Sequence, residues 1–538
     1  MKSMAESNKA ILEDKNPLSQ YTSPLKRPTL TEHELSTRAA LRNYTPALFW
    51  AVMVCMCTVM EGYDTILIPN FFAFPSFAKK YGSFDAATNT YQLSAEWQVA
   101  LGNSSGISAV LGIFVNGYLV SIYGHKKVLL GSLIFLSAAI TVVFLAPNIG
   151  ILCLGELLCG FPWGIIATIA PAYSSEILPL SLRGYLTTCT DLSFIIGQLL
   201  AAGTLDGLLK VDSSWSYRCA FALQWVWPVF IMPILIFMPD SPWHLVRKGK
   251  IEEAEKTLVK LTSKNARVDI KETLATIIRT NALEEQTVGG ATYSDCFRGT
   301  ERRRTEIACV TFAGQMLCGL VFAYNATYFF QQIGLNVTKS YQINLGASFI
   351  SVCGLLFGWF CLLPYIGRRK IYIFGMGSMS TILFLIGFLS FAASIRTVAT
   401  IQASLCLFWA FVFHLSVGQL GWAIPAEVGS TRLRQKTVCV ARIAFYIVNI
   451  LSKIVEPYFM NPTKLNLKGY TGFFWGIISL LTTLWAFFRL AETKDRTFEE
   501  LDILFERKVP TRKFASYVID NPTSSEENSN KDTPLRIQ

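Results

Sequence analysis

Two acidic residues in the middle of an apolar stretch are the first feature of this chain that could do chemistry. Glu61 and Asp64 lie in "VCMCTVMEGYDTILIPNFF" (54–72), within an apolar run that begins at Ala47. Residues three apart share one face of a helix. A charged Asp at the centre of a membrane helix costs about 2.5–3.5 kcal/mol, and burial and mutual repulsion both favour the neutral carboxyl. The pair is therefore expected to bind a proton or a cation; the alternatives are a structural salt bridge or a water-exposed helix end.

Two other charged residues fall inside apolar runs. Glu156, in "LGELLCGFPWG", is a second candidate for the proton site, and Arg442, in "CVARIAFYIV", requires a partner. The candidate partners are Glu61, Asp64 and Glu156. Alternatively, Arg442 lies near one end of its helix and extends its guanidinium to the membrane surface. Further along the same run, Lys453 and Glu456 are expected to be charges at the outer rim.

The composition predicts a membrane protein that positions these charges on spanning helices. The chain has 538 residues, of which 52% are hydrophobic and 16% charged. Apolar runs of about 20 residues, each long enough to cross a bilayer, are centred near residues 58, 109, 137, 162, 195, 228, 318, 354, 381, 412, 448 and 480. The expected fold is all-α, with twelve transmembrane helices. The thirteen cysteines show no metal-binding spacing, and most lie in apolar runs as small buried residues.

The net charge of +11 follows the membrane topology and does not indicate nucleic-acid binding. Lys and Arg cluster in alternate loops, for example at Lys126 and Lys127, 302–304, 368–370 and 494–513. This pattern places the basic loops and both termini in the cytoplasm. An even number of spans agrees with that orientation.

The chain divides into five segments. We expect a disordered cytoplasmic tail (1–46), a first six-helix half (47–240), a cytoplasmic connecting segment (241–304), a second six-helix half (305–490) and a cytoplasmic C-terminal tail (491–538). The first 46 residues are polar and show no cleavable signal peptide. In the connecting segment, the apolar spacing in 248–261 predicts a short amphipathic helix.

Three landmarks recur in the same order in the two halves. "GHKK" at 124–127 matches "GRRK" at 367–370, "EILPLSLR" from Glu176 matches "EVGSTRLR" from Glu427, and "PDS" at 239–241 corresponds to "AETK" at 491–494. The offsets of 243, 251 and 252 residues indicate a duplication that places both halves parallel in the membrane. Such halves enclose a central site near the midplane. The chain has no phosphate-binding GxxxxGK[ST] motif, which argues against ATP-driven pumping.

The repeated landmarks carry charges at helix ends. We expect them to form a salt-bridge network that closes a cytoplasmic gate, with anchoring to the membrane surface as the alternative. The members are Glu176, Arg183, Asp240, Arg247, Arg368, Arg369, Glu427, Arg434 and Glu492.

These motifs resemble those of the sugar-porter branch of the major facilitator superfamily. "SSEILPLSLRG", "PDSPWHLVRKGK" and "AETKDRTFEELDILF" are similar to the sequences that follow its fourth, sixth and twelfth helices. More narrowly, "EGYDTILIPNFFAFPSFAKKYG", "CGFPWG", "FALQWVWP" and "VPTRKF" resemble fungal maltose and α-glucoside permeases. The resemblance implies a plasma-membrane symporter that imports a di- or oligosaccharide with a proton.

The chain departs from the family pattern at several positions. Ser121 and Ile122 replace the acidic and basic residues expected before Gly124, and Pro364 stands where the second half would carry an Asp. The latch between these loops is therefore expected to be weaker. Gly314-Gln315 replaces the Gln-Gln pair of hexose porters, which makes glucose or fructose a less expected substrate.

Polar residues of the spans are candidates for sugar binding. Asp191 lies seven residues before Gln198, so the two share a helix face, and Gln198 resembles the fifth-helix Gln of sugar porters. Further candidates are Gln315, Asn325 and Trp422, the last of which matches the tenth-helix Trp of the family. The alternative for each is packing between helices. His414 is expected to pack in the core.

The sequence therefore predicts a proton-coupled transporter that imports an α-glucoside such as maltose, functions as a monomer in the lipid bilayer, and needs no cofactor or metal. Alternatives are another cargo on the same fold, namely a β-glucoside, a hexose, a polyol or an exported secondary metabolite, and a non-transporting sugar sensor. The loops contain no nucleophile–base pair of the kind that would indicate an enzyme. Asn336, in "NVT", is a weak candidate for glycosylation in an outer loop.

Overall fold

The structure is a computed structural model. It describes residues 37–517, except 86–89, 212, 264–265, 267–268, 289–291, 393–395, 431–432, 495, 497 and 516.

The first half contains six spanning segments. They are α4 (Thr45–Cys55) continued by α5 (Cys57–Phe71); α7 (Ala95–Tyr123); α8 (His125–Leu145); α9 (Ile149–Ile177); α10 (Leu180–Leu208); and α11 (Trp215–Ala222), η2 (Leu223–Trp225) and α12 (Val226–Ile236) in succession. A short helix, α3 (Thr37–Asn43), precedes them.

The second half repeats this arrangement. Its segments are α16 (Glu301–Leu317), α17 (Leu320–Tyr324) and α18 (Ala326–Gln332); α19 (Val337–Phe357) with η4 (Gly358–Leu362); α20 (Arg368–Leu389); α21 (Arg396–Leu415) and α22 (Val417–Val428); α23 (Arg434–Met460); and α24 (Thr471–Arg489).

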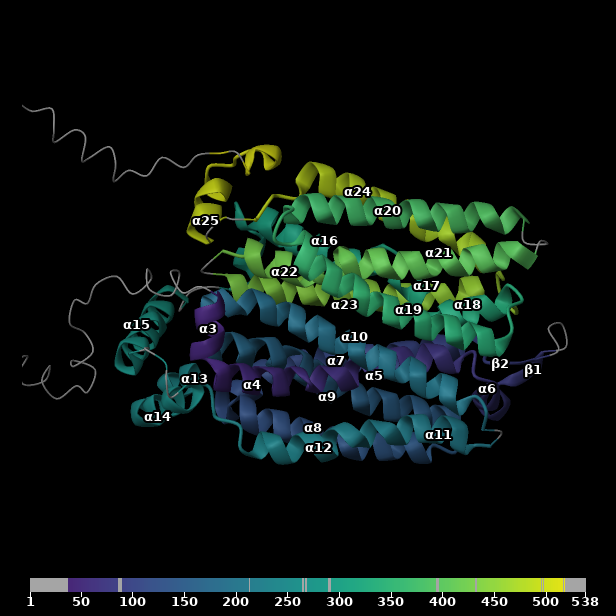
Figure 1. Cartoon of the computed structure of the whole chain (residues 1–538), viewed down its shortest axis with the longest axis horizontal. Helices are drawn as coiled ribbons and strands as arrows, with labels where there is room; N and C mark the ends of the chain where they lie inside the picture. Colours follow the sequence, from purple (N-terminus) through teal and green to yellow (C-terminus); the bar gives the residue numbers. More distant parts are fainter. Residues whose placement is uncertain are drawn as a thin grey trace, which may run out of the picture.

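Eleven of these segments are long and apolar enough to cross a membrane. The twelfth, α10, has 29 residues and lies within the bundle against α5. The two halves lie one above the other in Figure 1, with their helices running in the same general direction. The predicted twelve-helix fold is confirmed.

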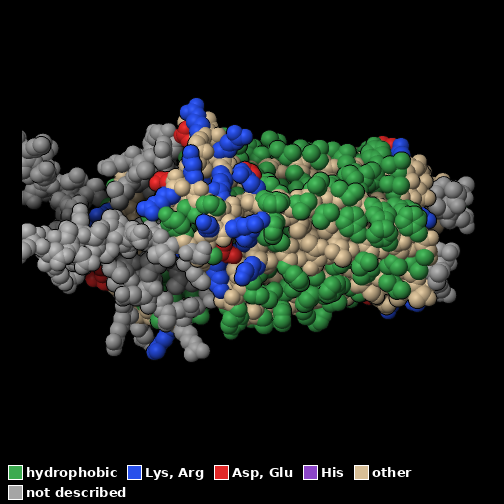
Figure 2. Space-filling view, turned by 90° about the horizontal axis from the view of Figure 1, so that it is seen from above, with side chains coloured by type: hydrophobic (Ala, Val, Ile, Leu, Met, Phe, Trp, Pro, Cys, Tyr) green, Lys and Arg blue, Asp and Glu red, His purple; other side chains and the backbone are tan. Residues whose placement is uncertain are grey.

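The two ends of the bundle differ in charge. A short hairpin of β1 (Ser83–Asp85) and β2 (Thr90–Gln92) with α6 (Pro75–Tyr81) marks one end, here called the hairpin end. Figure 2 shows Lys and Arg side chains gathered toward the opposite end, here called the basic end, beside an apolar middle. This distribution is typical of a membrane protein whose polar ends lie on either side of a lipid-facing belt.

The basic end carries additional short helices. They are α13 (Pro242–Arg247), α14 (Ile251–Leu261), α15 (Ile270–Val288) and α25 (Phe498–Glu506). The amphipathic helix predicted within 248–261 is α14, which buries Ala254, Leu258 and Leu261. Leu245 of α13 and Leu274 of α15 join Ala254 and Leu258 in a small hydrophobic core separate from that of the bundle. The α13, α14 and α15 helices therefore form one packed unit, which contacts α4 and α9 of the first half, whereas α25 packs against the second half.

Glycines allow two helices of the first half to lie almost backbone to backbone. A Cβ atom on Gly164 would lie 2.0 Å from the Ala109 carbonyl oxygen, and one on Gly112 would lie 2.1 Å from that of Phe161. Small residues at such crossings permit close van der Waals packing in membranes, where apolar helices gain little by leaving lipid. The α7–α9 contact thus depends on the absence of these side chains.

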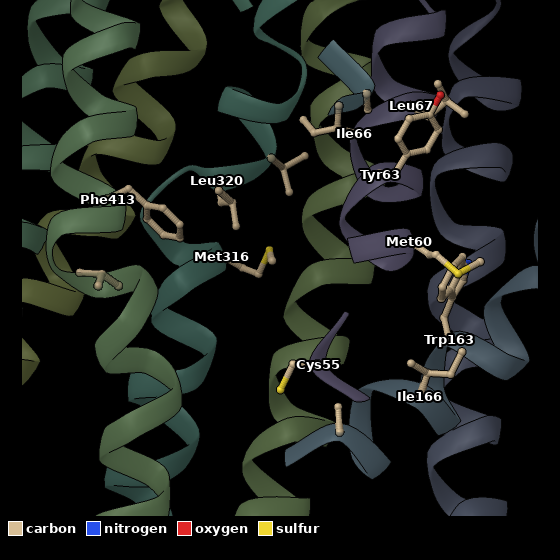
Figure 3. Packing of buried hydrophobic residues seen from close by; sticks show 14 of the residues in the cluster. Cys55, Met60, Tyr63, Ile66, Leu67, Trp163, Ile166, Met316, Leu320 and Phe413 are labelled. Carbon is tan, nitrogen blue, oxygen red and sulfur yellow. The ribbon is translucent and has the colours of Figure 1, made fainter. Parts of the chain in front are cut away.

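The core of the bundle is apolar and spans both halves. Figure 3 shows Met60, Tyr63 and Trp163 of the first half and Met316 and Leu320 of the second among the buried side chains. In this setting each polar group needs a partner, because lipid and apolar side chains offer none.

Glu456 departs from its expected place at the rim. It is 1% exposed and accepts a hydrogen bond of 2.6 Å from Nε1 of Trp475 on α24. Trp475 in turn packs against Gly319, whose φ of 91° marks the break between α16 and α17. The expectation of a rim charge was wrong, because the carboxyl turns inward between α23 and α24.

We predict that Gly164→Val destabilises the bundle by about 1–3 kcal/mol, since the new side chain overpacks the α7–α9 crossing. The thermal unfolding midpoint of the detergent-purified protein measures the effect. Gly117→Val is the control, because Gly117 of α7 has open space around its Cα. Equal midpoints for the two variants would contradict the close-packing argument.

We also predict that Trp475→Phe costs about 1–3 kcal/mol of stability, because it leaves the buried Glu456 carboxyl without its donor. Trp485→Phe is a matched control. Trp485 donates to Glu306, which retains the guanidinium of Arg489 at 3.0 Å. The unfolding midpoint should fall further for Trp475→Phe; an equal or smaller fall would show that this hydrogen bond is not needed.

Candidate functional site

Asp64 lies at the centre of the first half and is held by a neighbouring span. It is 5% exposed, and its Oδ1 accepts a hydrogen bond of 2.8 Å from Nε2 of Gln224 in η2. The indole of Trp163 lies beside the same carboxyl. The α5 helix thus directs Asp64 toward the α9 and η2 segments, away from lipid.

Glu156 and Lys453 join Asp64 in one electrostatic cluster. Glu156 of α9 is 1% exposed, and its Oε2 has no hydrogen-bond partner. The ammonium of Lys453, on α23 of the other half, interacts with the charges of both Asp64 and Glu156. The expectation that Lys453 is a rim charge was therefore wrong, because its electrostatic partners lie in the interior.

Glu61 and Arg442 form the second part of this cluster. Glu61 interacts with the charges of Arg442 and Asp64, and it is only half-buried, unlike its neighbours on α5. Arg442 donates from Nη1 to the Ala167 carbonyl oxygen at 3.0 Å and lies 4.8 Å from the ring centroid of Trp422. Arg442 therefore does not extend to the membrane surface. It crosses from α23 to α9 and makes a cation–π contact within its own half.

Tyr324 connects the proton candidates with the sugar candidates. Its hydroxyl accepts a hydrogen bond of 3.2 Å from Nε2 of Gln198, across the interface between halves. It also interacts electrostatically with Asp191 and Glu61. Asp191 is 8% exposed, with an Oδ2 that has no hydrogen-bond partner. Asp191 and Gln198, two of the predicted sugar-binding residues, are thus linked through Tyr324 to Glu61 of the electrostatic cluster.

The remaining sugar-binding candidates make contacts within the second half. Gln315 donates to the Gly418 carbonyl oxygen at 2.6 Å, and Asn325 donates to the Val321 carbonyl oxygen at 2.9 Å. Trp422 stacks edge-on against Phe312, with ring centroids 4.9 Å apart. Trp422 and Asn325 are half-buried, so both keep accessible surface. His414 is buried as expected, at 7% exposed.

Asn70 is the centre of a hydrogen-bond network that joins the halves near the hairpin end. Its Oδ1 accepts from Thr327 at 2.5 Å and from Asn344 at 3.1 Å, while its carbonyl oxygen accepts from Tyr341 at 2.6 Å. Asn70 is fully buried. Three residues of the second half thus converge on one residue of α5.

Further contacts between halves lie around this network. They are Gln331 to the Ala73 carbonyl at 2.9 Å, Tyr328 to Gln92 at 3.0 Å, Asn461 to the Leu93 carbonyl at 2.9 Å, and the ion pair of Lys464 with Glu96 at 2.6 Å. The carboxylate of Glu96 raises the pKa of Lys464. Among the described residues, the hairpin end therefore holds several polar contacts that join the two halves.

Glu176 and Glu427, the repeated acidic residues at the basic end, have equivalent surroundings. Glu176 accepts from the Ser241 hydroxyl and lies 3.5 Å from Arg247 and 3.6 Å from His125. In the second half, Glu427 accepts from Thr493 at 2.5 Å and lies 3.5 Å from Arg368. Among the described side chains, neither set connects the first half with the second.

Other members of the expected gate differ in their contacts. Arg369 donates to the Phe487 carbonyl oxygen at 2.7 Å, and Glu492 accepts from the Lys494 backbone at 3.2 Å. Asp240 lies within electrostatic range of the buried His125 and His244. Burial, with the nearby Lys248, lowers the pKa of His244, which favours its neutral form. The side chains of Arg183 and Arg434 lie outside the described residues.

Three neighbours of the cluster were not singled out as site residues from the sequence. Gln224 is a polar residue within the apolar "FALQWVWP", a signal that could have been used. Lys453 is likewise a charge within a span. Tyr324 carries no comparable signal, since tyrosines are frequent in this chain. Among the described residues, no group of three or more His, Cys, Asp or Glu side chains could hold a metal ion.

The chain matches the family described as "Sugar (and other) transporter" over residues 50–505. It is 34% identical to an alpha-glucosides permease of Saccharomyces cerevisiae over 526 residues, covering 96% of this chain and 86% of that protein. A maltose permease of the same yeast is 34% identical over 498 residues, covering 91% of this chain and 80% of that protein.

Solved structures with the same fold agree with this match. A proton:xylose symporter of the major facilitator superfamily bound to 6-bromo-6-deoxy-D-glucose has a TM-score of 0.69 and 21% identity, covering 86% of this chain and 99% of that one. The Escherichia coli xylose transporter in a partially occluded inward-open conformation gives 0.66 and 19%, covering 84% and 100%. The chain belongs to the sugar transporter family, shares its fold with these solved transporters, and is a membrane transporter, not an enzyme.

Proposed function

We propose that this protein imports an α-glucoside such as maltose across the plasma membrane, together with a proton, by alternating access. The identity to yeast permeases named for maltose and alpha-glucosides supports the cargo. The solved proton:xylose symporter with the same fold supports proton coupling. The structural observation that carries the proposal is the charge balance of the central cluster.

Three carboxyl groups in this cluster face two cationic groups. Glu61, Asp64 and Glu156 lie near Arg442 and Lys453, so full ionisation leaves one uncompensated negative charge. An unpaired buried charge is costly in a low-dielectric interior. Binding of one proton makes the cluster neutral, and its release restores the charge, as a coupling site requires.

The proton and the sugar are proposed to meet through Tyr324 and Glu61. Glu61 keeps accessible surface, and Tyr324 connects it to Gln198 and Asp191. Sugar hydroxyls need several donors and acceptors, and the apolar face of a sugar ring packs on aromatic side chains such as Trp422. Occupation of this site is proposed to bring the halves together around both ligands.

The two ends of the bundle are proposed to act as alternating gates. In the described conformation the hairpin end is tied by bonds between halves around Asn70. Among the described side chains of the basic end, Glu176 pairs with Arg247 of the connecting segment and Glu427 pairs with Arg368 of its own half. We propose that the basic end faces the cytoplasm, with both termini, and that one chain suffices for transport. The membrane potential then contributes about 2.3 kcal/mol per proton charge per 100 mV.

Asn336 is a candidate for glycosylation under this orientation. It is exposed at the start of α19 on the side opposite the basic loops, and its Oδ1 accepts from the Thr338 backbone at 3.1 Å. Other cargoes are tested directly, because Oδ2 of Asp191 has no hydrogen-bond partner and provides an acceptor that differs in charge from an amide. Competition of unlabelled β-glucosides, hexoses and polyols with labelled maltose distinguishes them.

We predict that Asp64→Asn abolishes accumulation of maltose while leaving its equilibration measurable. The amide oxygen still accepts from Gln224, but the side chain no longer binds and releases a proton. Uptake of labelled maltose in yeast lacking maltose permeases, with and without an uncoupler, measures the two quantities separately. Asp206→Asn, on α10 and outside the cluster, should accumulate maltose as the unmodified protein does.

Two outcomes would contradict this assignment. Accumulation by Asp64→Asn at the normal level would exclude Asp64 as the coupling residue. Uncoupler-insensitive uptake by the unmodified protein would exclude proton coupling altogether.

We predict that Gln198→Leu raises the KM for maltose by about 2–13-fold, which corresponds to the loss of one hydrogen bond of about 0.5–1.5 kcal/mol. The kcat per surface-expressed molecule should change less. Gln402→Leu is the matched control, because Gln402 is equally buried but donates to Ile386 and Ser390 far from the cluster. A KM shift shared by both variants would assign the effect to general destabilisation.

A further inference from the structure

A groove of about 340 Å³ runs between three helices of the first half, outside the central cluster. It is lined by the basic-end parts of α7 and α8 and by the middle of α9. The residues that line it include Tyr123 of α7, Lys127, Gly131, Ser132 and Phe135 of α8, and Phe161 of α9. Neither the proton pathway nor the sugar site uses them.

The groove has space at Gly131 of α8, which has no heavy atom within 4 Å of the position its Cβ would occupy. Phe135 and Phe161, with ring centroids 6.0 Å apart and rings edge to face, form an aromatic part of its lining. The Ser132 hydroxyl is already bonded to the Val128 carbonyl oxygen. The groove therefore presents an apolar surface with no free donor on its floor.

The groove opens toward the surroundings of the bundle. Phe135 is 43% exposed and Tyr123 is 55% exposed. All three helices belong to the segments long and apolar enough to cross a membrane. Lipid is therefore the molecule that meets this opening, since the described lining is apolar apart from Tyr123, Lys127 and the already bonded Ser132, whereas a sugar requires several donors and acceptors.

Lys127 is the single charged residue that lines the groove. It is exposed, near the start of α8, and belongs to the basic end. The cytoplasmic leaflet carries anionic lipids that attract Lys and Arg near the membrane surface. An acyl chain along Gly131 and Phe135 would place a headgroup phosphate beside this ammonium, with the Tyr123 hydroxyl at the same mouth.

We propose that this groove binds one anionic glycerophospholipid of the cytoplasmic leaflet, with an acyl chain on the apolar floor and the headgroup at Lys127. The inference rests on the proposed orientation of the basic end toward the cytoplasm. It requires neither the proposed sugar nor proton coupling.

Native mass spectrometry of the purified full-length protein tests the proposal, with phosphatidylserine and phosphatidylcholine of identical acyl chains as probes. We expect phosphatidylserine to be retained about fivefold more than phosphatidylcholine, from one lysine near the surface. Lys127→Gln should remove this preference, and Gly131→Leu, which fills the groove, should reduce retention of both lipids.

Two control variants make the result specific. Lys126→Gln changes the adjacent lysine, which does not line the groove, and Gly117→Leu adds the same side chain at an open glycine of α7. Both should retain phosphatidylserine as the unmodified protein does. An equal loss in Lys126→Gln and Lys127→Gln would indicate diffuse charge attraction and overturn the site. Full retention by Gly131→Leu would overturn the groove as its location.

Maltose uptake in the same preparations, reconstituted into liposomes, separates this proposal from the transport proposal. Lipid retention without maltose uptake would refute the cargo but keep the lipid site. Maltose uptake with no preference between the two lipids would refute the lipid site but keep the cargo.

Discussion

The free-energy cost of burying charged side chains inside a membrane is the constraint on which the rest of this structure depends. Three carboxyl groups and two cations lie between helices in a bundle whose outer surface must remain apolar. No single helix can neutralise such a set. Glu61 and Asp64 on α5 depend on Arg442 and Lys453 on α23, so the charge balance itself requires the two halves to stay in contact.

This dependence makes the interface between halves a functional element as well as a structural one. Arg442 reaches the Ala167 carbonyl, and Gln198 reaches Tyr324. Polar bonds between membrane helices are individually modest, with measured values averaging about 0.6 kcal/mol. Contacts of this strength can hold one conformation and still be exchanged for others. A transporter needs that property, because each cycle must break and rebuild the contacts on both sides of its site.

The internal duplication shows where the halves have remained alike and where they differ. Glu176 and Glu427 each accept a hydroxyl from the segment after the sixth span of their half, through Ser241 and Thr493. The α8 and α20 helices, however, begin with different residues. Arg368 carries a permanent charge beside Glu427, whereas the equivalent position in the first half holds a histidine, and the cation beside Glu176 comes from a short helix outside the membrane. Equivalent acids are thus neutralised by different elements.

The sequence by itself determined the fold class, the number of spans, the duplication and the acidic character of α5, because these follow from local composition, period and spacing. Tertiary structure alone decided which charges meet. Lys453 and Glu456 are three residues apart on one helix, and the sequence places both at the rim. Their environments differ because one meets acids of the opposite half and the other meets Trp475 of the next helix. Which side chains pair depends on how each helix is rotated and how far it is shifted along the membrane normal relative to its neighbours. Helix packing determines both, so the spacing of residues along one segment does not predict the pairs.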